Sequence, residues 1–440
     1  VGDVPLDTGA SAGSGQFLPR LGLAYRLDDK SVVRAGYGHS ADPKPYIDFR
    51  NAFPINFAWS HPAVQFNGAT NAFIPVTTLR QGLDEARFGR KPDLTQGVIP
   101  LPAGAGTTTY PKEDERKYVQ SWNLMFQREL AGGFTAQVGY VGTRIQGQQG
   151  FVNINASAPG TGNAGRPLSR FGILTDINMI RPAGDGNYHA LQTELRGTTQ
   201  HAQIGVVYTL SRARNHQDND SNPRIQWPDA FELNYGLASL DRTHNLQTFW
   251  VWDLPFGKGR RFAEGGIGNI LFGGWQVNGL LSVMSGQPIN IIQGNAGNLN
   301  AGGSGQYPDR VKDDVEILGG IGLGNPYFDR SAFAPVNIAA GQPQRFGNAG
   351  RNPIRGPGFW NVDMGLFRTF SVSGEVRVQL RVEALNVFNH PNFATPGTGG
   401  QAGNDISNAG AFGYVTQTVN STGINGAGER QVRLGARVSF

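Results

Sequence analysis

The stretch Gln431-Val-Arg-Leu-Gly-Ala-Arg-Val-Ser-Phe440 alternates between two kinds of side chain. The even-numbered positions, from Val432 to Phe440, are apolar, and arginine, glycine and serine stand between them. Successive side chains of a β-strand point to opposite faces, so a period of two is the period of a strand. The stretch therefore predicts a strand with one apolar and one polar face that ends on an aromatic residue.

The same alternation recurs along the chain in segments of about ten residues. Residues 376–384 repeat it with valine, leucine and alanine at even positions and charged or amide side chains at odd positions. All such segments together predict about eleven strands. These strands include residues 21–27, 33–37, 122–126, 134–140, 189–195, 204–210, 246–256, 275–283, 360–366, 376–384 and 432–440.

Connections between these strands alternate between short and long, with Gly257–Ile270 of intermediate length at one of the short positions. Long structureless loops are rare in compact soluble domains, whereas outer-membrane barrels have short periplasmic turns and long extracellular loops. The pattern therefore predicts an all-β, antiparallel, up-and-down transmembrane β-barrel over residues 1–440, with the final strand ending in the periplasm. A β-sandwich is the alternative, but its loops would be short at both ends. The predicted long loops are about 41–114, 147–185, 213–241, 289–358 and 389–429.

The composition agrees with this class and excludes others. The 63 glycines and 26 prolines oppose long helices, and 10% aromatic residues argue against disorder. No segment approaches the ~18 uninterrupted apolar residues of a membrane helix. Without cysteine, the chain has no disulfide framework and no thiolate metal site. The net charge of +5 is not gathered into a basic block, so we expect no nucleic-acid partner.

Two stretches carry a resemblance to a known family. They are Phe346-Gly-Asn-Ala-Gly-Arg-Asn-Pro-Ile-Arg-Gly-Pro-Gly358 and Arg381-Val-Glu-Ala-Leu-Asn-Val-Phe-Asn-His-Pro-Asn-Phe393. With them the chain resembles the TonB-dependent outer-membrane receptors of the Oar-like type, whose precursors carry a carboxypeptidase-regulatory-like domain, a plug and a barrel. The resemblance implies a barrel of about 22 strands around a plug, energised through TonB. It also implies a location in the outer membrane of a Gram-negative bacterium.

The chain contains about half of those strands, and no plug-like region or TonB box precedes Phe17. We therefore expect a C-terminal barrel portion that lacks the plug and the N-terminal domain, with the partner of its last strand upstream of Val1. Closure with fewer strands is the alternative. The implied function is energised uptake of a nutrient ligand such as a siderophore or an oligosaccharide. A non-transporting surface or adhesion protein and a passive porin are the alternatives.

The resemblance also implies partners. These are outer-membrane lipid and lipopolysaccharide, the TonB complex through a plug that is not in this chain, and the barrel-assembly machinery. Phe440 resembles the terminal assembly signal that such barrels present to that machinery. Asn386, Asn389 and Pro391 have a role that does not depend on the family, because Asn and Pro end a strand and set a turn.

Few residues suggest chemistry. The histidines show no metal spacing and no phosphate-binding loop is present, so we expect no enzyme, no cofactor and no metal site. One loop imitates a calcium site, although Pro223 stands where that motif needs glycine. The calcium positions would be Asp218, Asp220, Asn222 and Asp229. His216 beside Asp218 is the weak basis for a hydrolase alternative.

Two sets of side chains are candidates for contact with a ligand or the lumen. Aromatic and arginine side chains of the long loops are candidate ligand contacts, with loop self-packing as the alternative. They are Arg50, Trp59, Trp227, Tyr235, Tyr307 and Tyr327. The polar faces of the last two predicted strands are expected to point into the lumen. They carry Arg377, Gln379, Arg381, Glu383, Arg433 and Arg437.

Overall fold

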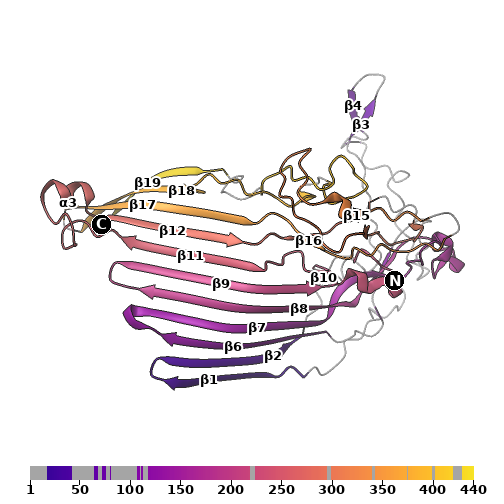
Figure 1. Cartoon of the computed structure of the whole chain (residues 1–440), viewed down its shortest axis with the longest axis horizontal. Coiled ribbons are helices and arrows are strands. Elements are labelled where there is room, and N and C mark those ends of the chain that lie inside the picture. The colour runs from indigo at the N-terminus through magenta and orange to yellow at the C-terminus, as the bar shows by residue number, and fades with distance from the viewer. Residues whose placement is uncertain are drawn as a thin grey trace.

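The computed structural model is dominated by one broad antiparallel sheet (Figure 1). It describes residues 17–41, 64–67, 72–75, 80, 107–109, 111, 117–218, 223–294, 299–338, 342–373, 375–398, 402–419 and 429–440. The main path of the sheet runs β1-β2-β6-β7-β8-β9-β11-β12-β17-β18-β19. The bounds are β1 Arg20–Asp28, β2 Ser31–Ser40, β6 Tyr118–Glu129, β7 Phe134–Asn153, β8 Ile177–Thr198, β9 Ala202–Asn215, β11 His244–Asp253, β12 Trp275–Met284, β17 Phe359–Ser373, β18 Val376–Leu385 and β19 Gln431–Ser439.

This path confirms the predicted all-β, up-and-down arrangement, because each strand pairs antiparallel with the preceding and following strands of the path. Each segment with period-two alternation overlaps one of these strands, although the predicted segment 246–256 runs past the end of β11 at Asp253. Strands β1 and β19 stand at the two ends of the path, and within the described residues no pairing joins them. The described sheet is therefore open at both edges, as expected for part of a wider barrel.

Short strands and helical turns lie outside the main path of the sheet. The short strands are β3 Val64–Asn67, β4 Ala72–Pro75, β5 Thr107–Thr109, β10 Gly236–Leu237, β13 Pro288–Ile289, β14 Asp309–Arg310, β15 Phe333–Ala334 and β16 Ile354–Arg355. The helical turns are η1 Ala131–Gly133, η2 Asn163–Gly165, η3 Ser169–Phe171, α3 Gly266–Phe272, η4 Pro228–Asn234 and η6 Arg330–Ala332. Among the described helices, none has the length and apolar character needed to cross a bilayer.

The strand register separates an apolar face from a polar face. Directly opposed residues of antiparallel strands project to the same side, and Val382 is opposed by Leu366 on β17 and Leu434 on β19. Large apolar side chains on this side are exposed, with Leu23 at 61% and Leu434 at 79%. A contiguous apolar surface on the outside of a sheet is suited to lipid rather than to water.

The opposite face carries the six predicted lumen residues. Arg433 opposes Glu383, and Arg437 opposes Gln379, so they project to one side of the sheet. The polar side chains of this face bond to one another, as when Arg381 Nε donates to Gln379 Oε1 at 2.8 Å. Their shared face agrees with the register expected from the sequence, and their contact with a lumen stays a prediction.

The two ends of the sheet differ as the loop lengths predicted. At one end most strands are joined by tight turns, and the β11–β12 connection there is longer and contains α3 (Figure 1). Phe440 lies at this end, because Ser439 pairs with Arg377 just after the β17–β18 turn. At the other end lie the long connections. The predicted loop over 147–185 was too wide, because β7 continues to Asn153 and β8 begins at Ile177. Continued pairing of their backbones extends this hairpin where the side-chain alternation fades.

Aromatic rings border the apolar face. Trp250 lies flat against the neighbouring strand at Gly279, where a β-carbon would come within 2.2 Å of the indole, so only glycine fits there. Near the tight turns the guanidinium of Arg368 stacks on Trp275 and Phe370, at 5.2 and 4.5 Å from their ring centres. Toward the long connections, Tyr140 and Tyr208 hydrogen-bond to His189 and His244. These amphipathic rings occupy the positions of interfacial girdles.

Candidate functional site

The connections β7–β8, β9–β11, β12–β17 and β18–β19 fold together into one body, which we call the loop assembly. It contains two small cores. In the first, the fully buried ring of Phe328 packs edge-on against Phe333 and Phe412, with centroids 5.9 and 5.4 Å apart. In the second, Ile225 and Leu299 pack with Tyr307 and Phe346. Ala349 touches both cores and joins them. The long loops therefore have an interior of their own.

Three arginines in and just before the family-like stretch Phe346–Gly358 hold the loop assembly together. Arg345 makes two bonds of 2.7 Å with the carboxylate of Asp309, a bidentate geometry. Its hydrogen bond and charge hold the pKa of Asp309 below the ordinary value. Arg355 pairs with the fully buried carboxylate of Asp241. Arg345 and Asp309 lie within the same β12–β17 connection, whereas Asp241 belongs to the β9–β11 connection, so Arg355 joins two separate loops as a clamp.

Arg351 is the centre of that clamp. Its side chain is 6% exposed, and its guanidinium pairs with Asp218 and donates to Asn215 Oδ1 at 2.6 Å. Partial burial acts to raise the pKa of Asp218, but hydrogen bonds from Ser239 and Arg351 outweigh it, so the pKa lies below its usual value. A desolvated pair of this kind is costly to break, because removal of one partner leaves the other charge buried.

A polar cavity of about 340 Å³ lies beside this pair. Arg224 borders it, donating from Nε to the Gln306 carbonyl at 2.7 Å and lying over the ring of Tyr307. Burial lowers the pKa of Arg224, and burial raises the pKa of Tyr307 to about 12. The phenol is therefore a neutral donor at physiological pH.

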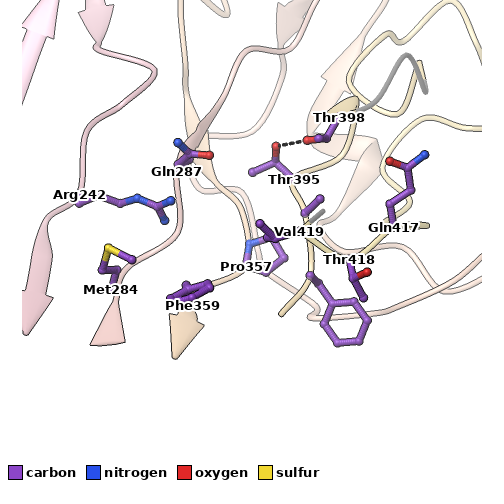
Figure 2. Close-up of a pocket in the computed structure, with 12 residues that line it drawn as sticks. Arg242, Met284, Gln287, Pro357, Phe359, Thr395, Thr398, Gln417, Thr418 and Val419 are labelled. Atoms are coloured by element: carbon purple, nitrogen blue, oxygen red, sulfur yellow. Dashed lines mark hydrogen bonds between the residues drawn. The ribbon is translucent and has the colours of Figure 1, made fainter. Parts of the chain in front are cut away.

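A larger cavity of about 500 Å³ has mainly apolar walls (Figure 2). Met284 and Phe359 stand directly opposite each other at the ends of β12 and β17 and form one side. The segments Phe393–Thr398 and Gln417–Val419 form the other side, and the Ala394 N–H joins them by donating to the Gln417 carbonyl at 2.9 Å. Within the first segment the Thr395 and Thr398 hydroxyls bond to each other at 2.9 Å. We call this the apolar cavity. Among the described residues that line it, Arg242 is the only charged one.

The predicted ligand contacts divide according to where they lie. Tyr307 and Tyr327 are only 1% and 8% exposed, because each packs inside one of the two cores. This burial agrees with loop self-packing, the alternative to ligand contact, for both rings. Trp227 packs against the second core. Tyr235 accepts the Asn187 side-chain amide at 2.7 Å and borders a third hollow of about 430 Å³. Arg50 and Trp59 lie outside the described residues.

The calcium-like loop and the hydrolase alternative meet at His216 and Asp218. Asp220 and Asn222 lie outside the described residues, Asp229 lies in the first turn of η4, and the Asp218 carboxylate is paired with Arg351. The described chain contains no cluster of three potential metal-binding acids or histidines. His216 is buried, accepts the Asp185 backbone N–H at 3.0 Å and stacks on Phe231. It has the contacts of a packing residue, and the calcium hypothesis stays untested.

Asn386 and Asn389 take the turn role predicted for them. Both have positive φ, at 48° and 50°, which Asn tolerates better than most residues. Asn386 Oδ1 accepts the His390 N–H at 2.9 Å, and its side-chain amide donates back to the His390 carbonyl. This pair of bonds closes the turn after β18. Phe440, the predicted assembly signal, is 96% exposed.

Sequence reasoning missed Arg242 and the clamp arginines. A lone arginine in a polar loop is normally solvated, and only the fold brings Arg242 beside Met284 and Phe359. The one usable signal was the density of arginine within residues 345–355, which marked a special stretch without naming its carboxylate partners.

Comparison with known proteins agrees with the fold. Residues 2–433 match the family model described as outer membrane beta barrel domain, so the chain belongs to that family. Its location is therefore the bacterial outer membrane. A search of curated proteins found no match.

Solved structures with similarity include outer-membrane transporters. The transporter YddB from Escherichia coli is 10% identical, with a TM-score of 0.45 over 93% of this chain and 38% of its own. The FrpB iron transporter from Neisseria meningitidis is 12% identical, with 0.42 over 97% and 39%. The ferripyoverdine receptor of Pseudomonas aeruginosa is 10% identical, with 0.42 over 96% and 33%. The chain thus spans less than two fifths of each of these structures.

Proposed function

We propose that this member of the outer membrane barrel family is the C-terminal barrel portion of a TonB-dependent transporter that takes up a nutrient ligand. The observation that carries the proposal is the loop assembly. Short turns face the periplasm in outer-membrane barrels and long loops face outside, so the loop assembly is placed at the extracellular mouth. Its clamped cavities are suited to capture of a ligand before passage.

The clamp favours a receptor over a passive porin. A pore needs a loop only as a constriction, whereas Arg351 and Arg355 fix loops from distant parts of the chain around cavities. Preorganised walls lower the entropic cost of ligand binding. Energised transport would use a plug that contacts TonB, and we place that plug outside these 440 residues.

The same assignment implies the remaining partners. The apolar face would contact outer-membrane lipid and lipopolysaccharide, and Phe440 would present the last strand to the barrel-assembly machinery. Adhesion without transport is the alternative function for an exposed loop assembly.

Uptake by the complete gene product tests the proposal. The protein would be expressed in otherwise identical hosts with and without TonB, and accumulation of a labelled ferric siderophore, oligosaccharide or peptide would be measured. We expect uptake of one of these ligands that requires TonB. Equal uptake in both hosts would point to a porin, and no uptake of any ligand, together with binding of the loop assembly to cells or surfaces, would favour adhesion.

A further inference from the structure

The environment of Arg242 is unusual for a guanidinium. It lies just before β11 and reaches into the apolar cavity from the side of Met284 and Gln287 (Figure 2). Among the described residues its guanidinium makes one hydrogen bond, from Nη1 to the Ser285 carbonyl at 2.6 Å. No described carboxylate forms an ion pair with it. An arginine has five N–H donors, so most of the donors of Arg242 have no partner among the described protein atoms and can bind a ligand.

The neighbouring arginine shows what a satisfied site looks like. Arg355 pairs with the buried Asp241, the residue that precedes Arg242 in the chain. The carboxylate of Asp241 is therefore already paired, and the guanidinium of Arg355 lies near Arg242 as a second positive charge. Burial, followed by the charge of Arg355, lowers the pKa of Arg242. Both effects act against an isolated cation, and an added anion would relieve both.

The remaining walls of the cavity determine the polarity and the size of the part of the ligand that lies away from Arg242. Met284, Phe359, Phe393 and Val419 give an apolar lining, and the hydroxyls of Thr395 and Thr398 bond to each other. A volume of about 500 Å³ falls within the range of small-molecule sites. One cation on an apolar wall matches a ligand with one anionic end and an apolar body.

We propose that the apolar cavity binds an amphipathic carboxylate, whose anionic group pairs with Arg242 and whose apolar body lies against Met284, Phe359 and Phe393. A carboxylate matches the planar fork of a guanidinium, which can donate two parallel bonds to it. This proposal rests on the proposed function only in assigning a chemical class to a captured ligand. Binding itself needs neither TonB nor transport.

Calorimetry with three matched probes tests the proposal. The whole-gene protein would be placed in lipid nanodiscs and titrated with phenylbutyrate, phenylbutanol and phenylbutylamine, which share one apolar body and differ in charge. We expect the acid to bind at least about tenfold more tightly than the alcohol, because a hydrogen bond to a charged group is worth about that factor or more. The amine should bind most weakly.

Substitutions assign the preference to Arg242. Arg242→Gln should bind acid and alcohol equally, with the affinity for the alcohol unchanged because the apolar walls remain. Arg242→Lys, which keeps the charge and a donor toward Ser285, should retain a preference for the acid. Arg330→Gln is the matched control, since Arg330 bonds to Tyr414 and Ala409 away from the cavity, and it should behave like the wild type.

Three results would overturn the proposal. They are equal binding of acid and alcohol by the wild type, a full preference for the acid in Arg242→Gln, and binding of none of the probes. If Arg242→Gln does not fold, Arg242→Lys takes its place in the test, and equal binding of acid and alcohol by Arg242→Lys would also overturn the proposal. Absence of TonB-dependent uptake would leave cavity binding intact, and absence of cavity binding would leave uptake intact, so the two proposals fail separately.

Discussion

The sheet and the loop assembly are built on opposite plans. In the sheet, backbone ladders hold the strands and even large side chains such as Leu434 stay exposed. In the loop assembly, regular pairing is confined to two-residue strands, while Phe328 is fully buried and Arg351 nearly so. The sheet exposes its apolar side chains to its surroundings, whereas the loop assembly buries its own in a core.

The difference shows which solvent each region meets. An exposed leucine face is stable only where lipid covers it, so the sheet crosses the membrane. A region that buries rings and pairs its charges behaves like a protein in water. The loop assembly therefore stands clear of the bilayer, and substitutions should act on the two regions through different physics.

The largest effect is expected in the first loop core. Phe328→Ala removes a fully buried ring from between Phe333 and Phe412, and large-to-small changes of this kind cost about 3–5 kcal/mol. Hydrogen exchange of the loop assembly in the membrane-inserted protein would measure the local unfolding free energy. Amides of the sheet should keep their protection, and a matching loss across β11 and β12 would show that the regions are not independent.

Removal of the clamp is expected to cost nearly as much. Arg351→Ala leaves Asp218 without its main cation, and breaking a buried pair costs about 3 kcal/mol or more. Limited proteolysis should then cut the β9–β11 and β12–β17 connections faster.

Arg128→Ala is the matched control for the clamp variant. It breaks the solvent-exposed pair with Asp28 in the sheet, whose charged atoms lie 3.6 Å apart, and should leave the proteolysis rate unchanged. Equal resistance of both variants would refute the clamp.

A charge on the apolar face should disturb the sheet alone. Leu380→Arg places a guanidinium at the centre of β18 on the side of Leu434 and Val382, and such changes cost about 2–4 kcal/mol near the bilayer midplane. Gln379→Arg, one residue away on the polar face, should cost almost nothing. Urea-induced unfolding in vesicles compares the two variants, and equal losses would contradict the assignment of the faces.

Acid should loosen the loop assembly before the sheet. The hydrogen bond from Lys312 lowers the pKa of Asp329 to about 2, and the pKa of Asp309 is also lowered. Because these folded-state values lie below the unfolded value of about 3.9, their stabilisation is complete above pH ~4 and is lost as the pH falls through the folded values. Tryptophan fluorescence and proteolysis from pH 5 to pH 2 would follow this, and loss of loop protection above pH 5 would contradict it.

The sequence predicted the sheet far better than the candidate site. Residues 376–384 carry their own alternation, so strand, face and neighbours follow from a local pattern. The long continuation of β7 and β8 did not follow, because glycine-rich backbone pairing leaves no side-chain signature there. The apolar cavity takes its walls from residues 242, 284–287, 357–359, 393–398 and 417–419. No local pattern specifies a contact between segments so far apart in the chain.

A label scan along β18 tests the central claim most directly. The chain has no cysteine, so single-cysteine variants at each position from 376 to 385 can carry a spin label without background. In the membrane-inserted protein, collision rates with oxygen, which is concentrated in lipid, and with a water-soluble nickel chelate would be measured. We predict a period of two, with oxygen favoured at Val378, Leu380 and Val382 and the nickel chelate favoured at Gln379 and Arg381. Uniform accessibility, or the opposite phase, would contradict the account.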